Sequence, residues 1–553
     1  MQLATQPAAT TMIRCEVRSN TKRQRGNSDP SENVKAEHTV NQLYRAVTSQ
    51  QRLATSQALL RQLSHSEALV CNSLIKAGLN NALCLQLGFI INQPDTNDTA
   101  REEVETICWI FNSLFRGCSE SAREESINSF GHDLFHLLMK GMRLGAILST
   151  LSVFHICSGS LQGTSMLLQA GILSCISRSL QHHTNDDNTL LETLGLMKNL
   201  SYYGENYRLE MAEHAGLLPK LAHIPFSHPN NEKALERLSA LIRNLAVSTS
   251  TRPILAQKSY ILNAIARMGS HSSRYTQRNL LNILLSLGQE VDACIILCLH
   301  GDGVLINLLK RFLNHETDAA VRKRAARMLR MLACEGSASL LVHDSSLIDC
   351  LSQRALHDER QEVRTEAIDA IIRLAAFINA PMPQHKQVLD TFTQLASCSR
   401  TQPEILAQAL RKQASQTSNQ SSLIERRILL ESLAQMALSQ RLTNESKELA
   451  CAALLDLTEH ESNRGKLATC SILEALTQNA KIRNQNHDGG NDDPRKLYGI
   501  QALINLASVP TNRKAMANHN LLLQTLVLYA ASTRDEQIKR NVKKVILMLV
   551  SEL

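Results

Sequence analysis

Gly171-Ile172-Leu173 and Gly216-Leu217-Leu218 are two copies of a short pattern that returns along most of this chain. Each copy of this helix-start motif has one small or polar residue, then two aliphatic residues, then an apolar stripe at helical spacing. The later copies are Tyr260-Ile261-Leu262, Gly303-Val304-Leu305, Ser346-Leu347-Ile348, Gln387-Val388-Leu389, Arg427-Ile428-Leu429, Ser471-Ile472-Leu473 and Asn520-Leu521-Leu522. Subtracting successive first residue numbers gives intervals of 45, 44, 43, 43, 41, 40, 44 and 49. Periods of this length predict a stack of helical repeats, an α-solenoid.

A second series repeats at the same spacing in the last helix expected for each unit. Its pattern is aliphatic-x-x-aliphatic, and the third position falls at Ser113, His155, Asn199, Asn244, Ser286, Met331, Arg373, Lys412, Asp456 and Asn505. The intervals are 42, 44, 45, 42, 45, 42, 39, 44 and 49, so both series lengthen at their last step. The polar residues near 484–494 therefore indicate a loop inserted between two helices, and a second loop is expected near 92–100.

The apolar stripe of one unit explains why the units must stack. Four aliphatic residues lie at i, i+3, i+4 and i+7, and so on one helical face: Leu238, Leu241, Ile242 and Leu245. Two or three short helices cannot bury such faces alone, so neighbouring units must supply the core.

Several units resemble the armadillo repeat family. Its units begin the second helix with Ala-Gly-aliphatic, as in Ala170–Leu173 and Ala215–Pro219, and end the third with Asn-Leu-Ala, as in Leu241–Ala246 and Leu503–Ala507. Two later units, Asp318–Arg322 and Gln361–Arg364, are similar to the related HEAT repeats, whose helices start with Asp-x-x-Val-Arg. The copy at Lys412 is the poorest, because Gln413 replaces an aliphatic residue.

The resemblance covers about residues 50–553. Weaker copies at Gly78 and Gly131 extend the array toward the N-terminus. Together these features imply an all-α, right-handed α-solenoid of about 11 armadillo-type repeats with some HEAT-like units.

The first 40 residues differ from the rest. They are rich in basic residues and poor in large apolar ones, and we interpret residues 1–40 as a disordered basic tail and 41–553 as the solenoid. Lys22-Arg23-Gln24-Arg25 is compatible with a nuclear import signal, and the acid-poor, Ser- and Thr-rich composition with an organelle transit peptide.

Composition narrows the class of protein. Aromatic residues make up 3% of the chain, with Trp109 the single tryptophan, as expected for aliphatic helix–helix packing. The 14 cysteines are scattered through apolar stripes, which favours buried free thiols in a reducing compartment, the cytoplasm or nucleus. No 18-residue apolar run is evident, so no membrane insertion is expected.

The motifs of catalysis are missing. There is no phosphate-binding loop, nucleophile elbow or dinucleotide fingerprint. His132 and His136, beside Asp133, have a spacing that can hold a metal, but no third ligand follows, and Cys294 and Cys298 lie in an apolar run. We therefore expect surface histidines, core thiols, no metal, no cofactor and no enzymatic activity.

Charge is concentrated in the central repeats. No Asp or Glu occurs from Arg237 to Gln289, a stretch that contains Arg243, Arg252, Lys258, Arg267, Arg274 and Arg278. The stretch between Asp318 and Glu335 is also free of acids and holds five basic residues. Basic clusters of this kind favour anionic partners.

The armadillo resemblance implies where such a partner would lie. In that family the third helices line a concave groove, and an Asn there holds the backbone of an extended peptide. Asn199, Asn244 and Asn505 match that Asn, whereas Ser286, Met331, Arg373, Lys412 and Asp456 depart from it. With their basic neighbours, the predicted groove residues are Lys198, Asn199, Arg237, Arg243, Asn244, Arg324, Arg327, Arg330, Arg373, Arg411 and Lys412.

The expected function is a non-enzymatic scaffold or adaptor that binds an acidic or phosphorylated segment of a partner protein in this groove. One alternative is binding of RNA or another nucleic acid by the same surface, although aromatic residues for stacking on bases are scarce. Two further alternatives are a nuclear transport adaptor, whose Trp and Asn ladder is lacking here, and a chaperone cofactor.

Overall fold

The computed structural model of the protein describes residues 30–553, apart from positions 47, 65, 67, 94–97, 183–185, 272, 316, 335, 379–381, 398–402, 482–492 and 534. Within these residues every regular element is a helix, so the chain is all-α. Contacts divide it into two units, one ending at Ile172 and one comprising Leu173–Leu553.

The first unit contains eight labelled helices. They are α1 (Pro30–Arg45), α2 (Ser49–Leu63), α3 (Ala68–Lys76), α4 (Leu79–Ile91), α5 (Asp98–Gly117), α6 (Glu120–Arg143), α7 (Ile147–Cys157) and α8 (Leu161–Gln169). Helix α5 packs on α2 and on α7, and α6 packs on α4 and α8.

The second unit repeats a short first helix, a second helix and a third helix. Its helices up to residue 332 are α9 (Ile172–His182), α10 (Asp187–Leu200), α11 (Glu205–Glu213), α12 (Leu217–Ser227), α13 (Glu232–Val247), α14 (Arg252–Gln257), α15 (Ser259–His271), α16 (Arg274–Leu287), α17 (Val291–Leu299), the 3₁₀ turn η1 (His300–Gly303), α18 (Val304–Leu313) and α19 (Ala319–Leu332).

The remaining helices continue the same order. They are α20 (Ala338–Leu341), α21 (Ser345–His357), α22 (Gln361–Ala375), α23 (Pro383–Ser397), α24 (Pro403–Ala414), α25 (Thr417–Ile424), α26 (Arg427–Leu438), α27 (Asn444–Glu459), α28 (Glu461–Leu467), α29 (Cys470–Ala480), α30 (Pro494–Ala507), α31 (Pro510–Ala517), α32 (Leu522–Ser532) and α33 (Glu536–Val550).

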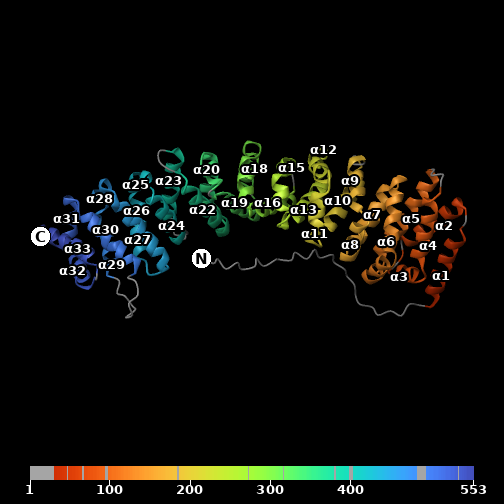
Figure 1. Ribbon diagram of the computed structural model, residues 1–553, viewed down its shortest axis with the longest axis horizontal. Helices are drawn as coiled ribbons and strands as arrows, with labels where there is room; N and C mark the ends of the chain where they lie inside the picture. The colour runs from red at the N-terminus through yellow and green to blue at the C-terminus, as the bar shows by residue number, and fades with distance from the viewer. Residues whose placement is uncertain are drawn as a thin grey trace. The chain divides into compact units, whose positions relative to one another are not determined.

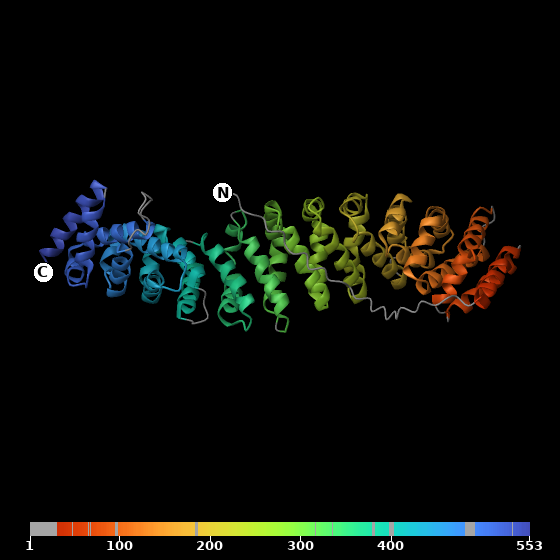
Figure 2. The ribbon, with the colours of Figure 1, turned by 90° about the horizontal axis from the view of Figure 1, so that it is seen from below.

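Like helices pack on like helices through the second unit. Each third helix contacts the next in the series α10, α13, α16, α19, α22, α24, α27, α30 and α33, and the second helices from α12 to α32 form a parallel row (Figures 1 and 2). The predicted stripe of α13 is buried, since Leu238, Leu241, Ile242 and Leu245 are at most 1% exposed. The prediction of a helical solenoid is confirmed for this unit.

Glycine in the helix-start motif has a conformational reason. Gly171, Gly216 and Gly303 have φ values of 83°, 74° and 84°, and each immediately precedes a second helix. A Cβ built on any of them would meet no atom within 4 Å. The left-handed backbone, rather than a lack of space, therefore favours glycine here.

The other copies of the motif are less uniform than the sequence suggests. Leu521, with φ 66°, takes the glycine position before α32, so the register of that copy is one residue later than the predicted Asn520. Gly78 has the expected left-handed φ of 88°, but Gly131 lies inside α6 and starts no helix. Gln387 also lies inside a helix, because α23 begins earlier.

The poorest copy of the second series, at Lys412, has the polar residue Gln413 buried in the core. The buried side chain of Gln413 donates to the carbonyl of Ala375 at 2.7 Å and accepts from Asn419 at 3.0 Å. Its Oε1 also lies 3.2 Å from Nε2 of His385. The bond to Ala375 helps to satisfy the last carbonyl of α22. Between α22 and α23 no first helix is present among the described residues.

The boundaries predicted for the tail and loops need adjustment. Helix α1 begins at Pro30, inside the segment assigned to a disordered tail, so residues 30–40 are helical. The remainder of that tail, with its basic residues, lies outside the described residues, and its disorder stays a prediction. Most of the predicted loop near 484–494 and part of that near 92–100 also lie outside them.

One stretch of the described chain is, contrary to the prediction from sequence, long and apolar enough to cross a membrane by length and hydropathy. It is Val291–Leu313, with a mean hydropathy of 1.6. It is not one continuous helix, because Gly301, Asp302 and Gly303 have φ values of 54°, 51° and 84° between α17 and α18. Leu308, Leu309 and Phe312 of α18 are core residues.

Candidate functional site

A group of basic side chains lies on neighbouring third helices in the middle of the second unit. Arg278 comes from α16, and Arg324 and Arg327 come from α19, which packs on α16 (Figure 1). We call these three residues the arginine cluster. Arg327 is exposed and forms no ion pair or hydrogen bond with any residue in the described part of the chain.

Arg324 is held at the centre of the cluster. Its Nε donates to Oδ1 of Asn282 on α16 at 3.1 Å, and its Nη1 donates to the carbonyl of Ala320 at 3.1 Å. Burial lowers the pKa of Arg324, and the charges of Arg278 and Arg327 lower it further, while Asp318 acts in the opposite direction. The three guanidinium groups therefore repel one another, and an anion placed among them would relieve that repulsion.

Asp318 partly neutralises the positive charge of the arginine cluster. Nη2 and Nε of Arg278 donate to Oδ2 of Asp318 at 2.7 and 3.1 Å. The carboxylate also caps α19, because its Oδ1 accepts from the amides of Ala320 and Val321. Since the Arg278 side chain remains 49% exposed, this pair leaves part of its guanidinium open to a ligand.

The asparagines that were predicted to hold a peptide backbone interact instead with other parts of the protein. Asn244 is 8% exposed, and its Nδ2 donates to the carbonyl of Lys198 at 3.3 Å and to Oγ of Ser201 at 3.0 Å. Its Oδ1 accepts from Nη2 of Arg243 at 3.3 Å. Asn244 therefore ties α13 to α10 instead of presenting its amide to a peptide. Asn199 also has an interaction partner and lies half-buried.

Two predicted arginines of α13 have internal roles. Arg243 donates through Nη1 to Oδ1 of Asn279 at 2.9 Å, and Arg237 donates to the carbonyl of Leu191. Both side chains are half-buried between third helices. They contribute positive charge to this face, but their hydrogen bonds join neighbouring units.

The C-terminal part of the predicted basic face is mixed in charge. Nε of Arg330 lies 2.8 Å from Oε2 of Glu366, and Arg411 forms an ion pair with Asp456 on α27. The pKa of Asp369 is raised, because the effect of burial outweighs the lowering effect of Arg330. Asp369 lies on the same helix as Arg373. Arg373 and Lys412 are exposed. The excess of positive charge is thus narrower than predicted and centres on α16 and α19.

Two residues at this site, Arg278 and Asn282, are not among the groove residues predicted from the sequence. Arg278 lies in the acid-free stretch, and its place one unit before Asp318 could have indicated the pairing. The role of Asn282 as the acceptor for Arg324 depends on the packing of α16 on α19 and has no sequence pattern of its own.

The residues considered for chemistry do not assemble into a reactive site. His132 and His136 stack edge to face with ring centroids 4.7 Å apart, and the described residues contain no group of three or more potential metal ligands. Cys294 and Cys298 are buried, and burial raises the pKa of each thiol to about 12. The prediction of core thiols is confirmed for this pair.

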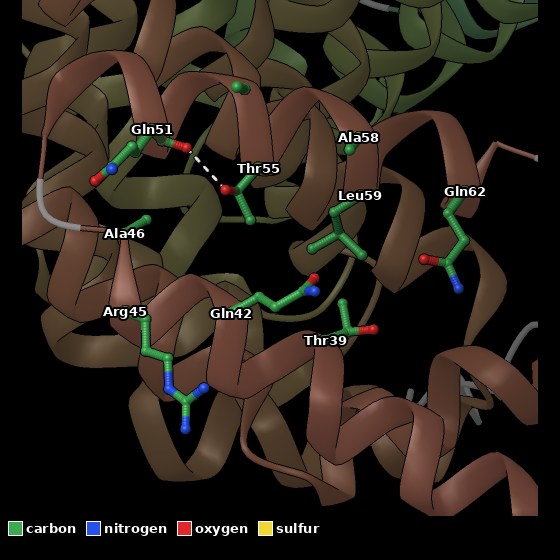
Figure 3. A pocket seen from close by; sticks show the side chains of 10 residues that line it. Thr39, Gln42, Arg45, Ala46, Gln51, Thr55, Ala58, Leu59 and Gln62 are labelled. Carbon is green, nitrogen blue, oxygen red and sulfur yellow. Dashed lines mark hydrogen bonds between the residues drawn. The ribbon is translucent and has the colours of Figure 1, made fainter.

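Two pockets open in the first unit. A pocket of about 560 Å³ lies between α1 and α2, where Thr39 and Gln42 face Thr55 and Leu59 (Figure 3). Its lining is mainly neutral. Thr55 donates to the carbonyl of Gln51 at 2.8 Å, and Arg45 is the single charged lining residue.

The second pocket, of about 830 Å³, lies between α4 and α6. Cys84, Asp133 and His136 line it together with both apolar and polar residues. Burial, and then the charge of Asp133, raises the pKa of the Cys84 thiol to about 12. This thiol stays protonated at neutral pH, so it does not provide a thiolate nucleophile.

Comparison with known proteins agrees with the repeat geometry. No protein-family model matches the sequence, and no curated protein matches it. One similar solved structure comes from a study of a phosphorylation switch in the interaction between cadherin and β-catenin. It has a TM-score of 0.57 and 13% identity, over 93% of this chain and 100% of that one. The chain has the fold of armadillo-repeat proteins.

Two engineered proteins are also similar. The crystal structure of one matches with a TM-score of 0.53 and 16% identity, over 76% of this chain and 98% of that one. A designed armadillo repeat protein in complex with the peptide (KR)4 gives a TM-score of 0.39 and 18% identity, over 46% of this chain and 99% of that one. At 16% identity the likeness to the first of these concerns the fold alone.

Proposed function

We propose that this protein is a non-enzymatic scaffold that binds an acidic or phosphorylated segment of a partner protein at the arginine cluster. The observation that carries the proposal is the position of Arg324, half-buried and close enough to Arg278 and Arg327 for their charges to act on it, with Asp318 the one acidic residue in the described part of the chain that offsets its charge. Phosphate and carboxylate groups accept the paired hydrogen bonds that a guanidinium offers.

The surroundings of the cluster suit an extended ligand. Lys323 and Arg274 are exposed on the same two helices, and Arg274 donates to Oγ1 of Thr317 at 3.0 Å. Basic side chains thus continue along α16 and α19 beyond the cluster itself. A chain with several acidic or phosphorylated residues could contact them in succession.

The armadillo-repeat fold supports the general class of function. The β-catenin structure named above concerns an interaction with cadherin that phosphorylation controls. A protein partner for this chain is the corresponding proposal, with the acidic or phosphorylated nature of the segment resting on the arginine cluster alone. The buried free thiols favour a reducing compartment, so we place this activity in the cytoplasm or nucleus.

The proposal is tested by screening acidic peptides, each in phosphorylated and unmodified form, against the wild-type protein and the double variant R324E/R327E. A suitable control is K514E, because Lys514 is exposed on the first helix α31 and its substitution changes charge away from the third helices. Binding that is lost in R324E/R327E and kept in K514E supports the proposal. Binding that is equal in all three proteins contradicts it.

Nucleic acid is tested in the same experiment. Single-stranded RNA is titrated over a range of salt concentrations, since its affinity should fall with a logarithmic slope of about −0.7 per phosphate contact. Tighter binding of RNA than of every acidic peptide would assign the arginine cluster to nucleic acid.

A further inference from the structure

A second surface of the second unit, on the short first helices, has the opposite character to the arginine cluster. Helix α17 buries Ala293, Cys294, Leu297 and Cys298 but leaves its other aliphatic residues outside. Val291 is 66% exposed, Leu299 is 58% exposed, and Ile295 and Ile296 are partly exposed. Val291, Ile295 and Leu299 are four residues apart, so they form a row about 12 Å long on one side of the helix.

The equivalent helix of an earlier repeat shows that this row is unusual. Helix α11 has the same length as α17, and its buried Met211 and Ala212 correspond to Leu297 and Cys298. In that alignment Glu205, Glu210 and Glu213 stand where α17 has Val291, Ile296 and Leu299. The solvent-facing side of α11 is therefore more polar than that of α17, where these three acidic positions carry aliphatic residues.

The neighbouring first helix extends the apolar surface. Helix α20 packs on α17, and Leu340 of α20 is 41% exposed. Just before α20, Gly336 lies against Ile295, because a Cβ on Gly336 would be 3.0 Å from Cδ1 of Ile295. We call the exposed or partly exposed aliphatic residues of these two packed helices, Val291, Ile295, Ile296, Leu299 and Leu340, the aliphatic face.

The charges around the aliphatic face indicate what would cover it. Asp292 is exposed at the start of α17 and Asp302 is exposed just after its end, and neither has an ion-pair partner among the described residues. Glu290, beside them, is paired with Arg252 at 3.6 Å. Carboxylates at both ends of an apolar row repel anionic membrane surfaces and attract cationic groups.

We propose that the aliphatic face binds a basic amphipathic helix of a partner protein. The aliphatic residues of that helix would lie along Val291, Ile295 and Leu299, and its Lys or Arg residues would meet Asp292 and Asp302. A helix fits because the row follows helical spacing over about two turns. This binding mode is separate from the proposed function, since it uses first helices and the opposite charge.

The probe for this proposal is a synthetic peptide helix with Leu at i, i+3, i+4 and i+7 and Lys on either side of that stripe. Its matched counterpart keeps the leucines and replaces each Lys with Glu. Fluorescence anisotropy measures the affinity of both for the full chain. We expect the basic peptide to bind about tenfold tighter or more, and the double variant V291E/L299E to weaken its binding by about tenfold or more.

The chain offers a matched control. Leu161 is 56% exposed at the first position of α8, which aligns with Val291, but no aliphatic row follows it on α8. L161E should bind the basic peptide like the wild type, and so should R324E/R327E, which separates this result from the proposed function. V291E/L299E introduces on α17 the acidic residues that α11 has at the equivalent positions, Glu205 and Glu213. The double variant should therefore keep the wild-type helical content by circular dichroism.

Three results would overturn the proposal. The first is equal affinity for the basic and acidic peptides, or basic-peptide binding that V291E/L299E does not reduce. The second is a dimer in sedimentation that V291E/L299E dissociates, which assigns the face to a second copy. The third is binding to phosphatidylcholine vesicles that the same variant abolishes, which assigns it to a lipid surface.

Discussion

Arg322 and Asp358 form a buried, two-point ion pair that joins the third helix α19 to the turn between α21 and α22. Nε of Arg322 lies 2.7 Å from Oδ2 of Asp358, and Nη2 lies 3.1 Å from Oδ1. The two side chains are 7% and 0% exposed. Arg278 and Asp318 form a second Arg–Asp pair one unit earlier, in which both hydrogen bonds go to Oδ2 and Arg278 is half-exposed. We call these two pairs the Arg–Asp ladder. Asp318 and Arg322, one residue from each pair, belong to the HEAT-like sequence Asp318–Arg322.

Removing one side of this pair should strongly destabilise the protein. In D358A the guanidinium of Arg322 would remain buried without its carboxylate, at a cost of about 3–5 kcal/mol. Urea unfolding followed by circular dichroism measures the loss. The matched variant D318A should cost less, because Arg278 is half-exposed and can be solvated. A D358A loss no larger than that of D318A would contradict this view of the ladder.

The ladder also predicts how stability depends on pH. Burial would raise the pKa of Asp358, but hydrogen bonds from Arg322 and the amide of Arg360 outweigh it, so the pKa is lowered. Burial would also raise the pKa of Asp344, but hydrogen bonds, chiefly that from Lys310, together outweigh it, so this pKa is lowered as well. Nζ of Lys310 lies 2.8 Å from Oδ2 of Asp344. A carboxyl with a lowered pKa in the folded state stabilises the fold above its unfolded pKa, about 3.9.

That stabilisation is lost as the pH falls through the folded pKa. The urea midpoint of the wild type should therefore fall as the pH is reduced below about 5. D344N, which cannot titrate, should show a shallower fall over the same range. An identical pH dependence for D344N and the wild type would show that Asp344 does not contribute.

Leu521 occupies a position at which other repeats use glycine. Its φ of 66° is strained for a residue with a Cβ, and at 42% exposure Leu521 is far less buried than the neighbouring core residue Leu522. L521G should therefore stabilise the chain by about 1 kcal/mol, measured by thermal or urea unfolding. The reverse change, G216A, should destabilise it by a similar amount. A destabilised L521G would mean that side-chain packing outweighs backbone strain at this position.

Gln413 should tolerate no apolar replacement, although it stands where an aliphatic residue was expected. In Q413L the carbonyl of Ala375 and the amide of Asn419 would each lose one of their buried partners, and Nε2 of His385 would lose its contact with Oε1 of Gln413, at a total cost of about 1–3 kcal/mol. Urea unfolding of Q413L against the wild type measures this cost. Stability equal to the wild type would show that water or rearranged side chains replace the glutamine.

The periodic features of the fold were predictable from sequence because each rests on local chemistry. Gly171 and Gly216 mark left-handed turns, and Leu241 and Leu245 mark a buried stripe, so spacing alone located the second and third helices. The register at Leu521 was not predictable, because a leucine in a left-handed turn has no sequence pattern.

The predicted site was less accurate, since a count of basic residues does not show which of them are already bound. Arg252 belongs to the acid-free stretch, yet it donates to the carbonyls of Ala246 and Val247 and so caps the end of α13. Arg464 caps α27 in the same way at Thr458 and Glu459. Only the packing of successive units shows that Arg327 lacks such a partner among the described residues.

The central claim is that the arginine cluster binds an anionic segment, and exchange of charge across the interface tests it most directly. An acidic peptide that binds the wild type is titrated by calorimetry against R327E, and a second peptide with Lys in place of its acidic residues is titrated against both proteins. We predict that R327E loses on the order of tenfold or more in affinity for the acidic peptide and gains affinity for the lysine peptide. Unchanged binding of the acidic peptide by R327E, with no gain for the lysine peptide, would contradict the account.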